Sequence, residues 1–248
     1  MSKVKIEAHD DVAILRLNNG VTNAINPELV DDLAETLHQA KKEFKGLILA
    51  GGTKFFSIGF DLPALLQLDR PAMADFYFKF NQTVLDLYTL PLPTACAIAG
   101  HAIAGGTILA LAADFRFASS GRKLMGLNEV KIGVPVPFLA DLMLRQIVGD
   151  RQATELNYRG EFLEAEQAHK IGLLDVVCFA QELDQKAIEK IADLTALPRY
   201  GFPLIKANRV EEIQSRFKEK GSVKIGLFID CWFNPAVQEL LKEAAKRF

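Results

Sequence analysis

The chain has 248 residues, of which 50% are apolar and 24% charged, and its formal net charge is −2. So high an apolar fraction with so small a net charge excludes an intrinsically disordered chain. The balance of 29 basic and 31 acidic residues, without a long basic run, argues against nucleic acid as a partner. The length suits one large domain, or one domain with a small appendage.

The cysteines and histidines indicate a reducing compartment and no metal site. Cys96, Cys178 and Cys231 lie far apart without a C-x-x-C pair, so we expect no disulfide framework and a cytoplasmic location. The 4 histidines do not cluster in the sequence, which argues against a metal site. The first residues lack the apolar core of a secretory signal, and the longest apolar stretch, 98–113, is too short and too interrupted to span a bilayer. We therefore expect no membrane contact.

Strands and helices alternate in the first part of the chain. The run 12–17, which ends at an Asn-Asn-Gly turn, predicts a strand. Asn26, Pro27 and Glu28 are typical of a helix start, and the apolar stripe after them predicts a helix up to Gly46. We predict further strands over 47–50, 94–99 and 114–118, and further helices over 71–90 and 105–113. This alternation predicts an α/β fold.

From about residue 137 the pattern indicates helices only. The predicted segments are 137–147, 150–158, 164–171, 181–196, 202–218 and 222–246. No strong linker separates the two parts, and no sequence repeat of fixed period is visible. We therefore predict a core over residues 1–198 and a helical C-terminal region over residues 199–248.

Two glycine-containing turns follow predicted strands. They are segment 55–62, Phe-Phe-Ser-Ile-Gly-Phe-Asp-Leu, and segment 99–107, Ala-Gly-His-Ala-Ile-Ala-Gly-Gly-Thr. In each, a strand gives way to a helix, where backbone N–H groups have no acceptor within the helix. Two such groups facing one point would form an oxyanion hole. Taken singly, each segment is explained better as a tight turn.

A third segment, 125–135, places Glu129 between apolar residues and glycines. A carboxyl group in such surroundings is often buried, and burial raises its pKa towards the range of a base that works near neutral pH. Taken alone, a glutamate that caps a helix or forms an ion pair is the simpler explanation.

In this order and at this spacing, the three segments resemble motifs of the crotonase (enoyl-CoA hydratase/isomerase) superfamily. The first is similar to F-x-x-G-x-D-L, and residues 100–114 are similar to N-G-x-A-x-G-G-G followed by a helix and Asp. The third is similar to E-x-x-x-G-x-x-P, with Glu129, Gly133 and a displaced proline. The resemblance runs from about residue 4 to the C-terminus. It implies an α/β, crotonase-like superhelix of ββα turns with a helical C-terminal region that makes trimers.

The resemblance also implies a chemistry. The backbone N–H groups of Phe60 and Gly105 would hold the thioester oxygen of an acyl-CoA as it becomes an enolate, and Glu129 would act as the acid/base. The implied partner is an acyl-CoA thioester bound by a homotrimer or a dimer of trimers. No cofactor is implied, because coenzyme A is part of the substrate.

The acidic positions indicate the subclass. Hydratases of this superfamily use two glutamates, and the first of the two positions is Ile108 in this sequence. Water addition shares its proton transfers between two acids, whereas a single carboxylate suffices to move a double bond. The segment 126–129, Gly-Leu-Asn-Glu, and the pair Pro137-Phe138 are similar to Δ3,Δ2-enoyl-CoA isomerases. The resemblance thus implies conversion of a 3-enoyl-CoA to a trans-2-enoyl-CoA.

The substrate-binding residues implied by the resemblance come from the N-terminal loop and the three motifs. Two departures from the family pattern concern these segments. Ala104 stands where the family has its first glycine, and the N-terminal loop lacks the basic residue often found upstream, which leaves the contacts to the CoA phosphates unassigned. The implied residues are Ala24, Ser57, Ile58, Asp61, Leu62, Ile108, Asn128 and Phe138.

Alternatives remain open at this stage. A hydratase or another enolate reaction, such as a decarboxylation or thioester hydrolysis, would need a replacement acid, for which Asp141 is a candidate. A CoA-thioester binding protein without turnover is the third hypothesis. Phe228, Trp232 and Phe233 would either close the acyl pocket or belong to the core or a trimer contact. We expect Asp114 to be structural and His101 to be packed. The basic residues Lys242, Lys246 and Arg247 would reach a neighbouring subunit's CoA or form a solvated face.

Overall fold

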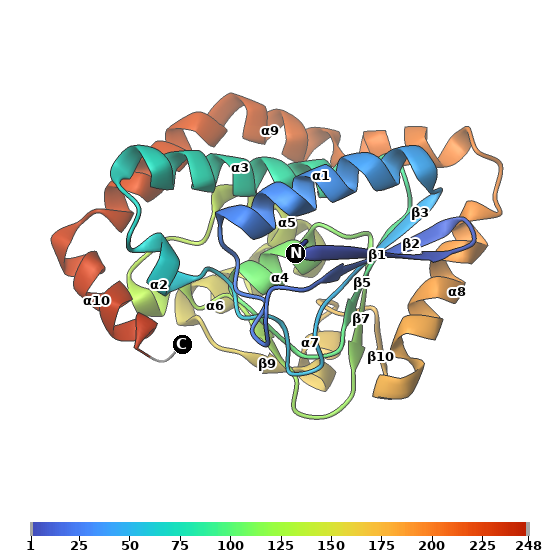
Figure 1. The fold of residues 1–248 in the computed structure, drawn as a ribbon, viewed down its shortest axis with the longest axis horizontal. Coiled ribbons are helices and arrows are strands. Elements are labelled where there is room, and N and C mark those ends of the chain that lie inside the picture. The colour runs from blue at the N-terminus through green and yellow to red at the C-terminus, as the bar shows by residue number, and fades with distance from the viewer. Residues whose placement is uncertain (1, 247–248) are drawn as a thin grey trace.

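The computed structural model describes residues 2–246, and in this range the strands form two sheets (Figure 1). The larger sheet has β1 antiparallel to β2, and its remaining neighbours are parallel. In the smaller sheet β9 is antiparallel to β8 and the other pairs are parallel. The larger sheet has the order β1 (Val4–His9), β2 (Val12–Leu17), β3 (Gly46–Ala50), β5 (Thr94–Ile98), β7 (Phe115–Ser119), β10 (Val176–Cys178), and the smaller one β4 (Phe55–Ser57), β6 (His101–Ile103), β8 (Leu124–Gly126), β9 (Leu163–Glu164).

The chain builds these sheets through three similar strand–strand–helix units. Each unit adds its first strand to the larger sheet and its second strand to the smaller sheet. The units are β3-β4 with α3 (Arg70–Tyr88), β5-β6 with α4 (Gly105–Leu111), and β7-β8 with α5 (Phe138–Val148). The predicted ββα superhelix is therefore confirmed. Because parallel second strands end at one edge of the smaller sheet, the three loops that follow them come together there.

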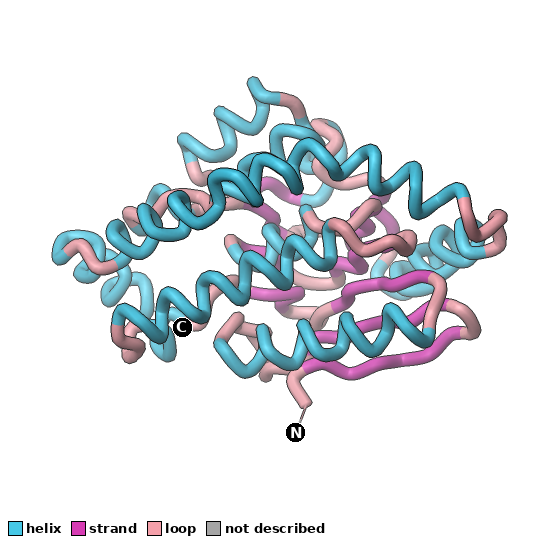
Figure 2. The backbone as a smooth tube through the Cα atoms, turned by 90° about the horizontal axis from the view of Figure 1, so that it is seen from above, coloured by secondary structure: helices cyan, strands magenta, loops and turns pink. Residues whose placement is uncertain are grey.

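Helix α1 (Pro27–Glu43) begins as its sequence predicts. The Asn26 side chain accepts a hydrogen bond of 3.0 Å from the Leu29 N–H, and Pro27 stands at the first helical position, where its missing N–H leaves no donor unsatisfied. The helix buries Leu33 and Leu37 on the face that meets the core. Helices α1, α3 and α9 (Gly201–Trp232) lie side by side over this core (Figure 2).

The prediction that only helices, and no strands, follow residue 137 is wrong at two places. Strand β10 pairs with β7 and forms the edge of the larger sheet, and β9 pairs with β8 at the edge of the smaller sheet. Both strands are two or three residues long, too short for an alternating pattern to show in the sequence. The helices in this part of the chain are α6 (Asp150–Arg159), α7 (Ala165–Lys170), α8 (Leu183–Thr195), α9 and α10 (Pro235–Ala245).

The predicted helix break near residue 220 is also wrong. Helix α9 continues through Gly221, where the ring of Phe217 lies so close that an added Cβ would stand 3.1 Å from it. Glycine therefore serves packing at this position rather than ending the helix. The break comes at Asn234, whose side chain accepts from the Ala236 N–H to start α10.

The C-terminal helices cover the end of the core where the loops meet. Helix α9 packs against α3 and α5, and α10 packs against the short helix α2 (Leu62–Leu65) and the 3₁₀ turn Glu129–Ile132. The predicted division at residue 198 falls between α8 and α9, and the predicted trimer stays a prediction. Within residues 2–246, none of the helices combines the length and apolar character needed to cross a membrane.

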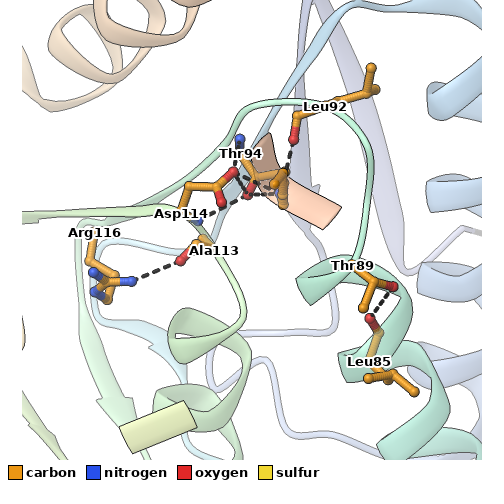
Figure 3. A network of polar contacts seen from close by, with 8 residues as sticks. Leu85, Thr89, Leu92, Thr94, Ala113, Asp114 and Arg116 are labelled. Carbon is orange, nitrogen blue, oxygen red and sulfur yellow. Dashed lines mark hydrogen bonds and ion pairs between the residues drawn. The ribbon is translucent and has the colours of Figure 1, made fainter. Parts of the chain in front are cut away.

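An ion pair joins the buried Lys206, near the start of α9, to the half-buried Asp114 beside the larger sheet. Figure 3 shows Asp114 with its partner Thr94. The Lys206 ammonium donates to an Asp114 carboxylate oxygen at 2.7 Å and to the Leu92 carbonyl oxygen at 3.0 Å. The same Asp114 oxygen accepts from the Thr94 N–H at 2.8 Å and the Thr94 hydroxyl at 2.9 Å. Burial lowers the pKa of Lys206, and the Asp114 carboxylate opposes this shift. Asp114 thus has the structural position expected of it.

Removing one member of this pair should destabilise the fold. Lys206 is 3% exposed, so in Asp114→Asn its ammonium would be left buried without a counter-ion, and in Lys206→Met the Asp114 carboxylate would lose its cation. We expect a loss of about 3 kcal/mol of unfolding free energy for Asp114→Asn. The loss should be smaller for Lys206→Met, because the Asp114 side chain is 26% exposed and keeps its hydrogen bonds from Thr94. The double variant should lose clearly less than the sum, which urea unfolding of all four proteins will measure. Additive losses would contradict a direct coupling between the two side chains.

Candidate active site

A cavity of about 280 Å³ lies where the three loops meet. Its lining is apolar except for Asn128, Glu129 and exposed backbone groups. Helices α9 and α10 close one side of it with Phe228, Trp232 and Ala244. The other lining residues are Phe55, Ile58, Phe60, Leu62, Ile103, Ala104, Gly105, Ile108, Ile132, Val134, Pro137 and Phe162.

The turn after β4 leaves a backbone donor without a partner. The Ile25 N–H donates to the Gly59 carbonyl oxygen at 2.7 Å, and the Asp61 N–H donates to the Ile25 carbonyl oxygen at 2.9 Å. These two bonds fix the backbone on either side of Phe60. Within residues 2–246 the Phe60 N–H itself donates no hydrogen bond.

The turn after β6 provides a second such donor. Gly105 is the first residue of α4, so its N–H has no acceptor in the helix, and it donates to no other group in the described residues. A Cβ added to Gly59 would lie 3.0 Å from the Gly105 nitrogen, which shows how closely the two turns approach. Gly59 has φ +92°, so this position favours glycine for its backbone conformation as well.

Ala104 is strained at the junction of β6 and α4. It has φ 47° and ψ −113°, a conformation that residues with a side chain rarely adopt. Its N–H donates to the Gly126 carbonyl oxygen at 2.9 Å, and its carbonyl oxygen accepts from the Ile108 N–H at 3.0 Å. These bonds hold the residue in place. The departure from glycine seen in the sequence is therefore a site of backbone strain beside the cavity.

Glu129 is a buried carboxyl group with an unpaired oxygen. It begins the 3₁₀ turn after β8, is 6% exposed, and its Oε2 has no hydrogen-bond partner in the described structure. Burial raises its pKa from 4.5 to about 7, and its own backbone N–H only partly opposes this shift. A buried carboxyl group that titrates near neutral pH can both accept and return a proton.

Seven of the residues implied by the family resemblance line this cavity, and four do not. Ser57 is fully buried, and its hydroxyl donates to the Asn23 carbonyl oxygen at 2.7 Å and accepts from the Gly59 N–H at 3.1 Å. Asp61 caps α2 by accepting from the Ala64 N–H. Ala24 is buried in the loop before α1, and Phe138 lines a neighbouring cavity. The lining residues are Ile58, Phe60, Leu62, Gly105, Ile108, Asn128 and Glu129.

The structure shows where the aromatic and acidic residues with alternative roles lie. Phe228 and Trp232 line the cavity, whereas Phe233 is half-buried with the Arg70 guanidinium 5.2 Å from its ring centre. Asp141 lines the neighbouring cavity, where one of its oxygens accepts from the Asn157 amide at 2.7 Å.

The remaining expectations concern residues away from the lining. His101 accepts from the Leu124 N–H at 3.0 Å and packs on Phe55, so it has the packed position expected. Lys242 and Lys246 pair with glutamates on their own helix, and Arg247 lies outside the described residues. No group of three metal-ligating side chains is present within residues 2–246.

Two lining residues lie outside every segment that the sequence singles out. Phe162 lies in the loop before β9, and Ala244 comes from the last turn of α10. Ile132 and Val134 lie within segment 125–135, but nothing in the sequence marks them as lining residues. The tertiary fold alone brings them to the cavity.

We expect Ala104→Gly to stabilise the protein. Glycine adopts φ 47° without strain, and the relief of about 1–3 kcal/mol exceeds the entropy that glycine adds to the unfolded chain, about 0.5–1 kcal/mol. The net gain should be about 1 kcal/mol in urea unfolding. Ala110→Gly, at the next-to-last position of α4, is the matched control and should destabilise by about 1 kcal/mol. Equal losses in both variants would show that Ala104 is not strained.

Glu129 should make the stability of the protein depend on pH. Its folded-state pKa is raised from 4.5 to about 7, so the unfolded state loses the proton first as pH rises. The native protein is therefore destabilised, relative to its state below pH 4.5, as pH rises through 7. Glu129→Gln mimics the neutral form, so its advantage in unfolding free energy should grow to about 3 kcal/mol between pH 4.5 and pH 8. A constant difference across this range would mean that Glu129 titrates normally.

Comparisons with known proteins agree on one family. The family model described as "Enoyl-CoA hydratase/isomerase" matches residues 7–242. The human protein "Enoyl-CoA delta isomerase 1, mitochondrial" is 27% identical over 248 residues, which cover 98% of this chain and 82% of the human protein. "Enoyl-CoA delta isomerase 3" of Arabidopsis thaliana is 32% identical over 177 residues, 68% of this chain and 74% of the plant protein.

Solved structures show the same relationship. The crystal structure of human mitochondrial delta3-delta2-enoyl-CoA isomerase superposes with a TM-score of 0.95 at 25% identity, covering 99% of this chain and 97% of the human one. The enoyl-CoA hydratase from Bacillus anthracis superposes with a TM-score of 0.81 at 24% identity, covering 99% of this chain and 90% of that one, and shows that the fold is shared. The family model spans nearly the whole chain. This chain therefore belongs to the enoyl-CoA hydratase/isomerase family.

Proposed function

We propose that the protein is an enoyl-CoA isomerase that converts a 3-enoyl-CoA to a trans-2-enoyl-CoA with Glu129 as its acid/base. One observation carries this proposal: among the described residues that line the cavity, Glu129 is the only one with an ionisable side chain. Ile108 lies in the same lining, at the position where the family's hydratases have a glutamate. Two relatives of this chain bear the name enoyl-CoA delta isomerase, which supports the same conclusion.

The proposed reaction is a proton transfer from C2 to C4. The ionised Glu129 removes a proton from C2 of the substrate, and the electron pair of that C–H bond forms the new C2=C3 bond through a dienolate. The pair of the former C3=C4 bond then takes the proton back from Glu129 at C4. No atom is gained or lost, and no cofactor beyond the substrate's own coenzyme A takes part.

The two free N–H groups would stabilise the dienolate. In the proposed complex the thioester oxygen lies between the N–H groups of Phe60 and Gly105, and its negative charge grows as the C2 proton leaves. Backbone donors that are already held in place stabilise such a charge without reorganisation, and each is worth about 10²–10³ in rate. The apolar lining strengthens these hydrogen bonds because no water competes for them.

A hydratase is the second candidate, and the structure favours it less. Addition of water needs one group to activate the water and another to deliver a proton. Asp141, the replacement acid considered from the sequence, lines the neighbouring cavity and is already bonded to Asn157. Within residues 2–246, the lining of the Glu129 cavity offers a water molecule no second carboxylate to bind.

The decisive assay compares trans-3-hexenoyl-CoA with crotonyl-CoA by absorbance of the conjugated thioester. We expect the signal to grow with the first substrate and to stay constant with the second. Glu129→Gln should lower kcat/KM for the first substrate by at least about 10³, because the general base is lost. Asp141→Asn, a matched carboxyl-to-amide change in the neighbouring cavity, should retain the activity.

The pH profile gives a second readout of the same proposal. The ionised form of Glu129 is the active one in the free enzyme, so kcat/KM should rise with pH and level off above its pKa of about 7. Decay of crotonyl-CoA, or activity that survives in Glu129→Gln, would refute the proposed mechanism. Binding of acyl-CoA without any turnover would instead support the third hypothesis, a binding protein.

A further inference from the structure

A second, larger cavity of about 620 Å³ adjoins the Glu129 cavity. It lies between α5, α6 and α9. Apolar side chains such as Val136 and Phe138 line part of it, and polar or charged side chains line the rest: Asp141, Arg145, Asp150, Thr154, Asn157 and Lys224. Among the described residues, only Val134 and Phe228 line both cavities. These two side chains therefore form the wall between the cavities.

The larger part of this wall is the ring of Phe228, and its neighbours fix its orientation. It is 2% exposed and stacks on the Tyr77 ring with centroids 3.8 Å apart and planes 7° apart. On the same helix, Trp232 lies 6.1 Å away at 27°. Tyr77 in turn meets the Phe60 ring edge-on at 6.3 Å. A ring held in this way cannot swing aside without breaking the stack on Tyr77.

We propose that Phe228 limits the length of the acyl chain that the protein accepts. This inference rests on the proposed function, in which an acyl-CoA places its thioester at Phe60 and Gly105 and its C2–C4 segment beside Glu129. In this placement the rest of the chain lies along the remaining lining, which includes the buried side chains of Phe228 and Trp232. A straight acyl chain that fills this space ends against the Phe228 ring, and the larger cavity behind the ring stays out of its reach.

Truncation of the Phe228 side chain is the change that can open the wall between the two cavities. Val134 presents a small side chain, and its backbone is tied to Glu129 by a 3.1 Å hydrogen bond from its N–H to the Glu129 carbonyl oxygen. Trp232 lines only the Glu129 cavity, so its truncation would widen that cavity without joining it to the second one. Shortening Phe228 joins the two cavities and leaves the proposed catalytic groups in place.

The test compares chain length in the wild type, Phe228→Leu, Phe228→Ala and Leu227→Ala. Leu227 is the matched control, since it precedes Phe228 on α9 and lines only the larger cavity. Two series are measured: the Kd of saturated hexanoyl-, decanoyl- and tetradecanoyl-CoA, and kcat/KM for the corresponding 3-enoyl-CoA substrates. Binding of the saturated thioesters does not require isomerase activity, so the binding series tests the wall even if the proposed reaction is wrong.

In the wild type and in Leu227→Ala we expect affinity and kcat/KM to fall from the hexanoyl to the decanoyl and tetradecanoyl compounds. In both Phe228 variants the ratio of the decanoyl to the hexanoyl value should rise by about tenfold or more, because the added methylenes gain room beside the apolar side chains Val136 and Phe138 of the larger cavity. Hexanoyl-CoA binding by each variant shows that it is folded. If the alanine variant does not fold, the leucine variant, which keeps an apolar side chain, gives the answer.

Two results would overturn the inference. One is a wild type that binds tetradecanoyl-CoA more tightly than hexanoyl-CoA, which would show that no wall limits the chain. The other is a length profile that Leu227→Ala changes as much as the Phe228 variants do. If the binding profile shifts as expected but no variant isomerises any 3-enoyl-CoA, the proposed reaction fails and the assignment of Phe228 stands.

Discussion

The approach of the two glycine turns is the constraint on which the site depends. Gly59 and Gly105 belong to different ββα units, and parallel pairing of β4 with β6 places them side by side. The next residue, Gly106, lies so close to β4 that an added Cβ would stand 2.4 Å from the Ser57 carbonyl oxygen. Any side chain at these positions would push the turns apart and separate the two free N–H groups. The strain at Ala104 is tolerated at this junction because hydrogen bonds on both sides hold its backbone.

The C-terminal helices cover the cavity that the glycine turns help to form. The core alone would leave Glu129 at an open edge, and α9 and α10 cover it with Phe228, Trp232 and Ala244. Two contacts hold α9 in place along its length: the Lys206–Asp114 ion pair near its start and the stack of Phe228 on Tyr77 near its end. Removal of water from around Glu129, and with it the raised pKa, is therefore a consequence of tertiary packing far from the residue in sequence.

The sequence predicts the parts of the site that depend on backbone geometry, and it misses the parts that depend on tertiary packing. The cap of α1 at Asn26 and the turns around Gly59 and Gly105 have strong local signals, because few residue types satisfy those positions. Strands β4, β6, β8 and β9 have only two or three residues, so no periodicity marks them. Gly221 resembles a helix break, but its environment in α9 is a close contact with Phe217 that no local pattern reveals.

The sequence likewise predicts only some of the residues that surround Glu129. The three motifs correctly predict that Ile58, Leu62 and Asn128 line one cavity. Each of these residues follows a strand of the smaller sheet. Phe138 was expected beside them, but the start of α5 turns it into the adjoining cavity. Lys206 is a buried lysine that no sequence pattern singles out, and only the fold shows its partner Asp114.

The apolar lining of the cavity explains both the raised pKa of Glu129 and the lack of a second carboxyl group beside it among the described lining residues. A second glutamate at position 108 would place two acids in one apolar cavity, where like charges prevent both from being ionised together. With Ile108 in that place, burial raises the pKa of Glu129 to about 7 against the smaller opposing effect of its own backbone N–H. In the proposed reaction Glu129 first takes a proton from C2 and then gives it to C4, and such a group works best when neither form is strongly favoured. In that proposal, an apolar residue at position 108 both leaves out the second acid of a hydratase and favours a carboxyl group that titrates near neutral pH.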